Sequence, residues 1–242
     1  MHRFFLDLPL TTGQILAAPQ DRAHQLIRVL RISEGEQIVV FNGKGGEFEA
    51  TIGSIQGHHC TIEVGVFHDV QTESSLQVQL YQGIPKKDKL EFIAQKITEI
   101  GVHELIPVIS QHCASRSTRR EDRIVKIIEE AAEQSGRVQL MRYGGAVAYA
   151  QALERSREAD LRMIAWEREK ETGLADIHHR FPEAQTIAVF VGPEGGWAES
   201  EIELASKSGV VPFSLGPRIW RTETAGIVIP ALVLQEWTCG RR

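Results

Sequence analysis

Apolar and polar residues alternate with the period of β-strands through much of the first seventy positions. Residues 36–41 (EQIVVF) and 47–55 (EFEATIGSI) flank NGKGG, whose Asn-Gly and Gly-Gly pairs supply the positive-φ positions of a tight reversal. A third run, residues 60–67 (CTIEVGVF), follows the turn QGHH. Before these runs, residues 21–31 carry apolar side chains on one helical face: Ala23, Leu26, Ile27 and Leu30. The pattern predicts a small barrel with a helix across it.

The pattern changes after the polar segment 68–75, where we place a boundary between a first domain over 1–70 and a second over 74–242. Strand-like and helix-like stretches alternate from there on, at 76–84, 89–101, 104–110, 121–136, 161–167, 186–192, 210–216 and 222–237. Such alternation predicts an α/β domain with a mostly parallel sheet and helices on both faces.

Composition narrows the class of protein without deciding the function. The chain has 242 residues, 42% hydrophobic and 24% charged, which is typical of folded globular proteins. Its three cysteines are odd in number and widely separated, which disfavours a disulfide framework and a zinc cluster and favours a reducing cytoplasm. The N-terminus lacks a signal peptide, and the apolar C-terminal run is too short to cross a bilayer. We therefore expect a cytoplasmic protein with no membrane partner and no metal.

Positive charge is bunched although the net charge is −5. The densest stretches are 85–89 (PKKDK) and 116–126, and the second contains Arg116, Arg119, Arg120, Arg123 and Lys126. On pattern alone this second stretch is either a solvated helix face or a contact for nucleic acid.

Two glycine-containing bends follow predicted strands. Residues 192–196 (GPEGG) follow TIAVFV, and residues 216–221 (GPRIWR) follow VVPFSL. Ligands of parallel sheets bind beyond the carboxyl ends of the strands, and glycine lets the backbone approach them closely. An ordinary strand-to-helix turn remains the alternative. The phosphate-binding glycine motifs are missing, as are the usual serine-hydrolase and zinc-protease motifs, while Cys113 is a conceivable nucleophile but a more typical core residue.

The second bend continues into residues 214–226 (SLGPRIWRTETAG), which are rich in polar side chains. Thr222 and Glu223 fit the capped first turn of a helix. Helix capping does not explain Arg218 and Arg221, so this segment is a candidate functional site.

Five blocks of the sequence, in order, resemble the SPOUT methyltransferases, and specifically the bacterial enzymes that methylate N3 of a uridine in 16S ribosomal RNA. The blocks span nearly the whole chain: HQLIRVLRISEGEQIVVFNGKGGEFEA, QKITEIGVHELIPVIS, EEAAEQSGR, VGPEGG and SLGPRIWRTETAG. The resemblance implies a PUA-like RNA-binding β-barrel over 1–70, and a SPOUT domain with a deep trefoil knot over 74–242. It also implies a homodimer and a substrate in the small ribosomal subunit.

The resemblance further implies that S-adenosylmethionine binds in the knot. Carried over residue by residue, its pocket comprises Gly192, Pro193, Glu194, Gly195, Gly196, Leu215, Gly216, Ile219 and Trp220. The family usually has leucine in place of Trp220.

Methylation at uridine N3 requires that N3 lose a proton. Glu223 or a water could take this proton, and Arg221 could bind the ring carbonyls as they become negative. The RNA backbone would contact the barrel, the arginines of 116–126 and Arg137. Two alternatives remain open: an RNA-binding protein without catalysis, and an α/β enzyme that uses another nucleotide.

Overall fold

The structure is a computed structural model that describes residues 1–115 and 121–239. Its chain divides into two compact units. The first comprises residues 1–73 together with 132–140, and the second comprises 74–131 and the residues from 141 onward. The boundary near residue 73 was expected from the sequence, whereas the return of 132–140 to the first unit was not.

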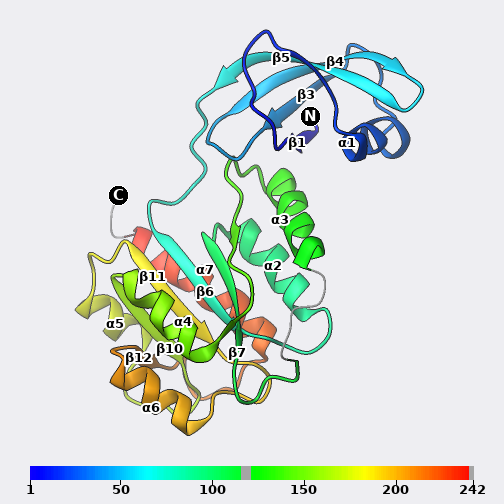
Figure 1. The fold of residues 1–242 in the computed structure, drawn as a ribbon. Helices are drawn as coiled ribbons and strands as arrows, with labels where there is room; N and C mark the ends of the chain where they lie inside the picture. Colours follow the sequence, from blue (N-terminus) through cyan, green and yellow to red (C-terminus); the bar gives the residue numbers. More distant parts are fainter. Residues whose placement is uncertain (116–120, 240–242) are drawn as a thin grey trace. The chain divides into compact units, whose positions relative to one another are not determined.

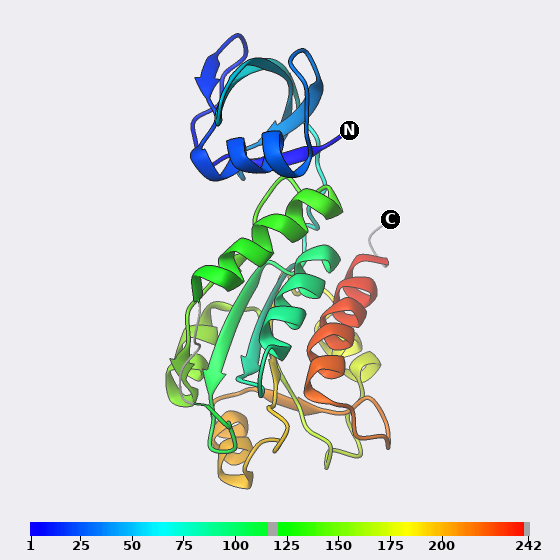
Figure 2. The ribbon, with the colours of Figure 1, turned by 90° about the vertical axis from the view of Figure 1, so that its right-hand side faces the viewer.

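The first unit is built on a five-stranded sheet with the order β1-β3-β4-β5-β2. The predicted meander forms β3, β4 and β5, which pair antiparallel, while β1 pairs with β3 in parallel. The elements are β1 (Arg3–Phe5), β2 (Ile15–Ala17), α1 (Gln20–His24), the π-helix η1 (Gln25–Val29), β3 (Gln37–Phe41), β4 (Glu47–Gln56) and β5 (His59–His68). Figure 2 shows the curvature of this sheet, with the helical segment beside it.

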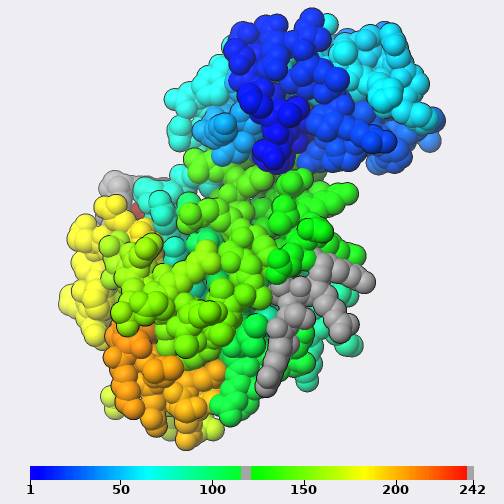
Figure 3. All heavy atoms as spheres, in the orientation of Figure 1, coloured from blue at the N-terminus to red at the C-terminus, as the bar shows by residue number. Residues whose placement is uncertain are grey.

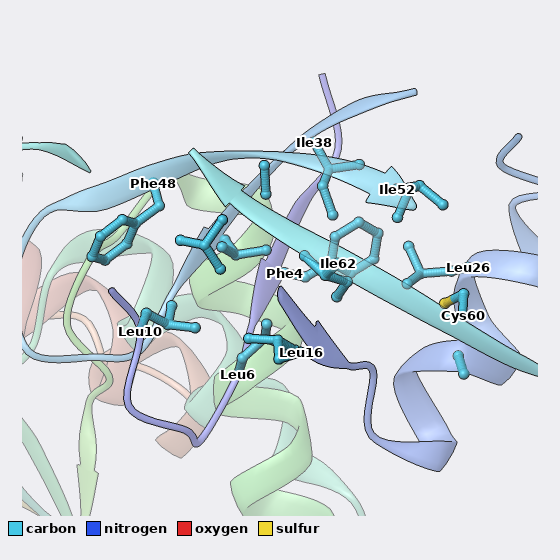
Figure 4. Close-up of a cluster of buried hydrophobic side chains, with 14 of the residues drawn as sticks. Phe4, Leu6, Leu10, Leu16, Leu26, Ile38, Phe48, Ile52, Cys60 and Ile62 are labelled. Atoms are coloured by element: carbon cyan, nitrogen blue, oxygen red, sulfur yellow. The ribbon is translucent and has the colours of Figure 1, made fainter. Parts of the chain in front are cut away.

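Alternate residues of these strands point into one apolar core. Figure 4 shows side chains from β1, β3, β4 and β5, such as Phe4, Ile38, Ile52 and Ile62, gathered around Leu26 of η1. Ala23 and Leu26 are buried, and Ile27 and Leu30 pack against the same core. The predicted apolar helix face is therefore confirmed, although the helix changes from α to π after His24.

Residues 132–140 are tied to the first unit by buried charged side chains. The carboxylate of Glu133 accepts the backbone N–H of Phe5 at 2.9 Å and pairs with the Arg22 guanidinium at 3.0 Å. Arg137 binds Glu73 through two nitrogens, Nε at 3.1 Å and Nη2 at 2.6 Å. Burying a charge is costly unless it is paired, so these contacts hold the segment in the first unit.

The second unit is a sheet of strands in the order β12-β10-β11-β6-β7-β8, with β9 also on β7, and every pairing is parallel. Its strands are β6 (Gln77–Gly83), β7 (Glu104–Ile109), β8 (Arg142–Tyr143), β9 (Val147–Ala148), β10 (Leu161–Ala165), β11 (Thr186–Val191) and β12 (Val211–Phe213). Its helices are α2 (Lys89–Ile100), α3 (Glu121–Ser135), which ends in the first unit, α4 (Tyr149–Arg155), the 3-10 turn η2 (Ser156–Glu158), α5 (Leu174–Arg180), α6 (Glu199–Lys207) and α7 (Thr222–Cys239).

Helices cover both faces of this sheet (Figure 1). On one face α4 and α6 pack on Tyr81, Ile106 and Phe190, and Figure 3 shows their atoms on the outside, in yellow-green and orange. On the other face α2 packs against α7, which also contacts β6 and β11. The predicted α/β fold with a parallel sheet is confirmed, and the trefoil knot stays a prediction. Among the described residues, no helix is long and apolar enough to span a membrane.

Candidate active site

A pocket of about 300 Å³ lies at the carboxyl ends of three neighbouring strands, β10, β11 and β12. This is where parallel sheets bind ligands, and the volume is within the range of small-molecule sites. Four segments line the pocket: Ala165, Trp166 and Glu167; Val191, Gly192, Glu194, Gly195, Gly196 and Trp197; Phe213, Ser214, Leu215, Gly216, Arg218, Ile219 and Trp220; and Thr222, Ala225 and Ile229 of α7.

The structure brings together the two glycine bends that the sequence singled out. Eight of the nine expected cofactor residues line the pocket: Gly192, Glu194, Gly195, Gly196, Leu215, Gly216, Ile219 and Trp220. Pro193 is not among the lining residues and lies against the end of β6 instead. A Cβ on Gly83 would come within 2.6 Å of the Pro193 nitrogen, so these two backbones can meet only because residue 83 is glycine.

Three glycines of the bends are needed for different reasons. Gly196 and Gly216 have φ of +68° and +101°, in the left-handed region that other residues rarely adopt. Gly195 makes room for a neighbour, because a Cβ there would lie 2.8 Å from the Cβ of His112. His112 also donates through Nδ1 to the Gly195 carbonyl at 3.0 Å, so the loop after β7 supports the first bend from behind.

Thr222 fixes the start of α7 to the first bend. Its hydroxyl donates to the Gly192 carbonyl at 2.6 Å and accepts from the side-chain amide of Gln82 at 2.9 Å. Gln82 is completely buried at the end of β6. The hydroxyl that the sequence suggested as a helix cap thus links α7, β6 and the pocket loop.

Lys89, Glu194 and Glu223 form a charged cluster beside the pocket. The Lys89 ammonium lies 3.0 Å from Oε1 of Glu194 and 2.9 Å from Oε2 of Glu223. Both carboxylate oxygens of Glu194 also accept the backbone N–H of Lys86, at 3.1 and 3.2 Å. The sequence indicated only that residues 85–89 are a basic stretch. In the structure, Lys89 of this stretch contacts two carboxylates beside the pocket.

The cluster sets the ionisation of its members. Burial pushes the pKa of Glu223 upward, but its own backbone N–H, the Lys89 ammonium and the nearby Arg221 outweigh burial and hold the pKa below its usual value. The pKa of Glu194 is likewise lowered, because Lys89 and backbone N–H groups outweigh the effect of burial. The neighbouring carboxylates of Glu223 and Glu194 raise the pKa of Lys89. All three groups are therefore charged at neutral pH.

The pocket wall carries a buried hydrogen-bond donor that no described protein group satisfies. Trp197 is 5% exposed, and its indole Nε1 has no hydrogen-bond partner within the described residues. A Cβ on Gly192 would lie 3.4 Å from this nitrogen, so the donor borders the glycine bend. Buried N–H groups are nearly always paired, so this indole N–H is a candidate donor to a ligand of the pocket.

The residues expected to bind RNA divide into three groups. Arg116, Arg119 and Arg120 lie outside the described residues. Arg123 is 57% exposed in its side chain and pairs with Glu91 on α2 at 2.8 Å. The Arg137 side chain is only 6% exposed and is held by Glu73, so in this structure it serves the packing of 132–140 and offers no exposed donor to a phosphate.

Sequence reasoning missed the third wall of the pocket, which Trp166 and Glu167 form after β10. The stretch 161–167 (LRMIAWE) is one of the alternating strand-like and helix-like stretches, and the residues after it lie at the same edge of the sheet as the two glycine bends. What was missing was the strand order, which puts β10 between β11 and β12.

Two family models match successive parts of the chain. The model of a family described as "RNA methyltransferase domain" matches residues 72–234, and one described as "RNA methyltransferase PUA domain" matches residues 19–65. A protein of Bacillus subtilis named ribosomal RNA small subunit methyltransferase E is 32% identical over 239 residues and 93% of each chain. One of the same name from Rickettsia conorii is also 32% identical, over 91% of this chain and 89% of its own.

Two solved structures match this chain over nearly its full length. A crystal structure of a ribosomal RNA small subunit methyltransferase E from Neisseria gonorrhoeae, bound to S-adenosyl methionine, matches with a TM-score of 0.91 and 34% identity over 98% of both chains. A putative methyltransferase of Legionella pneumophila in complex with the same cofactor has a TM-score of 0.88 and 32% identity over 96% of both chains.

Proposed function

This chain belongs to the RNA methyltransferase family that includes the ribosomal RNA small subunit methyltransferases E, and on that premise we propose that it methylates N3 of a uridine in 16S ribosomal RNA, with S-adenosylmethionine as methyl donor. The observation that carries the proposal is the pocket at the ends of β10, β11 and β12, where two glycine bends and an unsatisfied indole N–H form the walls. Relatives solved with the cofactor bound share the fold over almost the whole chain.

The residues of the pocket fit a ligand that is partly apolar and partly polar. Leu215, Ile219 and Trp220 supply apolar surface, the bends at 192–196 and 216 supply close backbone, and Trp197 supplies a donor. S-adenosylmethionine, when bound, carries a methyl group on a positively charged sulfonium that is ready for transfer. The protein then contributes mainly by alignment, because holding two reactants in line removes much of the entropic barrier.

The nucleophile needs more help than the donor, because N3 of uridine carries a proton. We assign to Arg221 the binding of the uracil carbonyls, since a guanidinium can stabilise negative charge that moves onto them. Arg221 is exposed and lies next to the second bend and to Glu223. Glu223 is ionised and therefore able to accept a hydrogen bond or a proton from N3, directly or through a water.

The RNA that flanks the uridine would be bound by the first unit and by the basic residues Arg116, Arg119, Arg120 and Arg123. The first unit matches a PUA domain of RNA methyltransferases, which supports this division of labour. Our proposal includes a homodimer and a cytoplasmic location, where the small subunit is assembled.

Incubation with methyl-labelled S-adenosylmethionine and unmodified small-subunit particles, followed by nucleoside analysis, tests the proposal. We expect one labelled nucleoside, 3-methyluridine. A different methylated nucleoside would support an RNA methyltransferase but would show that N3 of uridine is not the methylated atom. Binding of RNA without any methyl transfer and without cofactor binding would favour a non-catalytic RNA-binding protein.

The basic stretch has its own test. Replacement of Arg116, Arg119, Arg120 and Arg123 by alanine should weaken RNA binding and flatten its salt dependence, because fewer counterions are released, while cofactor affinity stays the same. An unchanged salt slope would assign this stretch to an ordinary solvated helix face.

A further inference from the structure

Lys89 is the point where three separate segments of the second unit meet. It is the first residue of α2, while Glu194 belongs to the loop after β11 and Glu223 to the first turn of α7. One ammonium contacts both carboxylates, at 3.0 and 2.9 Å. The side chain of Glu223 is only 18% exposed, so this contact is less screened by solvent than a surface ion pair.

The charge balance of the cluster makes Lys89 decisive for both carboxylates. Glu194 and Glu223 approach the same point, and without a cation between them their like charges would repel. Arg221 also lowers the pKa of Glu223, and backbone N–H groups, including that of Lys86, also donate to Glu194. The ammonium of Lys89, by contrast, contacts both carboxylates.

We propose that Lys89 is a positioning residue for methyl transfer, which holds Glu194 of the pocket loop and Glu223 of α7 on one ammonium and keeps Glu223 ionised beside the uracil. The inference rests on the proposed function, because Glu223 is the group assigned there to the N3 proton. It adds that the pocket wall and this proton acceptor are joined through a residue outside both glycine bends.

The direction of the effect follows from the charges. In the unchanged protein, protonation of Glu223 requires a pH below the usual range for glutamate, so the rate should not fall on this account near neutrality. Loss of the ammonium leaves two neighbouring carboxylates, and the first proton then binds at a higher pH. The acidic limb of the rate profile should therefore move upward.

Four variants separate this role from a general loss of an ion pair. Lys89→Met removes the charge but keeps most of the chain length, and Lys89→Arg keeps the charge. Lys96→Met is the control, because Lys96 lies on the same helix and pairs with Glu99 at 2.8 Å. Glu194→Gln acts in the opposite sense, since it leaves the ammonium to Glu223 alone and should lower the pKa of Glu223 further.

The first measurement needs neither cofactor nor RNA: the pKa of the Glu223 carboxyl by NMR in each protein. The second is the single-turnover methylation rate with saturating cofactor and RNA, as a function of pH. We expect Lys89→Met to raise the pKa, to lower the rate about tenfold or more, equivalent to about 1.4 kcal/mol of activation free energy, and to shift the acidic limb upward. Lys89→Arg should restore most of the rate, and Lys96→Met should resemble the unchanged protein.

The outcomes are distinct. If Lys89→Met matches Lys96→Met in both measurements, Lys89 is an ordinary surface lysine and the inference is wrong. If Lys89→Met does not fold, Glu194→Gln provides the test instead. The inference is then wrong if the pKa of Glu223 in Glu194→Gln is not lower than in the unchanged protein. If the unchanged protein transfers no methyl group, the proposed function is wrong, and Lys89 then has no role in methyl transfer.

Discussion

The hydroxyl of Thr222 accepts a hydrogen bond from the side-chain amide of Gln82 at 2.9 Å, although the two residues are 140 positions apart in the chain. The same hydroxyl donates to the Gly192 carbonyl, so one small side chain joins the end of β6, the first glycine bend and the start of α7. The position of the first glycine bend in the pocket is therefore fixed partly by the buried hydrogen bonds of the Thr222 hydroxyl.

Replacing Thr222 by valine keeps the shape of the side chain and removes the hydroxyl. Because Gln82 is fully buried, its amide then loses a partner that water cannot replace, and we expect the free energy of unfolding to fall by about 1–2 kcal/mol. Denaturation in urea measures this loss. Thr222→Ser retains the hydroxyl and is the matched control. Equal stability of the two variants would show that the hydrogen bond contributes little.

Gly195 and His112 offer a test by compensation. An alanine at 195 would place its Cβ 2.8 Å from the Cβ of His112, so Gly195→Ala should lower both the melting temperature and cofactor affinity. His112→Gly removes the clashing atom and should recover much of the melting temperature in the double variant. Gly216→Ala is strained by its φ of +101° in open space, at a cost of about 1–3 kcal/mol, and His112→Gly should not rescue it. Equal rescue of both variants would contradict the clash.

Trp197→Phe tests whether the unsatisfied indole N–H binds the cofactor. Phenylalanine lacks both the indole donor and the five-membered ring, so affinity for S-adenosylmethionine should fall about fivefold, or about 1 kcal/mol, and the smaller ring in the buried core should lower stability as well. Trp237→Phe is the reciprocal control, because its Nε1 donates to the Phe181 carbonyl at 2.9 Å and Trp237 does not line the pocket. That variant should lose stability and keep its affinity, as calorimetry can measure. If Trp197→Phe binds S-adenosylmethionine as tightly as the unchanged protein, the indole N–H does not bind the cofactor.

The pH dependence of stability should report on Glu194. Its pKa in the folded protein lies below the value of about 4.5 that it has when unfolded. The unfolded state then binds more protons, so the contribution of Glu194 to stability is present above pH 4.5 and is lost as the pH falls toward the folded pKa. Glu194→Gln should therefore lose less stability between pH 6 and pH 3.5 than the unchanged protein, as measured by denaturation at both values. A parallel decline in the two proteins would mean that the carboxylate is not stabilised by Lys89 and Lys86.

Arg221→Lys should separate catalysis from binding. Lysine keeps the charge but loses the planar pair of donors, so we expect the single-turnover rate to fall about tenfold while affinities for cofactor and RNA stay close to their original values. Should the variant lose cofactor binding with no separate effect on the chemical step, Arg221 belongs to the cofactor pocket.

Local patterns predicted much of the fold. The meander of β3, β4 and β5 was readable because its strands alternate apolar and polar residues around glycine turns, and the parallel sheet was readable from its alternating strands and helices. The family, predicted from five ordered blocks, is confirmed. The change to a π-helix after His24 has no comparable signal, since the same apolar face suits either helix.

The candidate site was predictable in its glycine bends and not in its charged contacts. Strand ends followed by glycine pointed to 192–196 and 216, because ligands approach parallel sheets there. Lys89 and Arg137, by contrast, stand in stretches whose charges look solvated. Only the tertiary fold brings Glu194 and Glu223 to the first and Glu73 to the second.

The return of residues 132–140 to the first unit has a consequence for protein synthesis. A nascent chain that has emerged as far as residue 73 has Arg22 and Glu73 but still lacks Glu133 and Arg137, their partners in the finished fold. The first unit therefore cannot be completed until residue 140 has emerged from the ribosome, and by then β6, α2 and β7 have emerged as well. A fragment cut at residue 73 would keep the strands of the first unit and lose these pairings, so a fragment for isolated study needs residues 132–140 supplied in trans or joined by a linker.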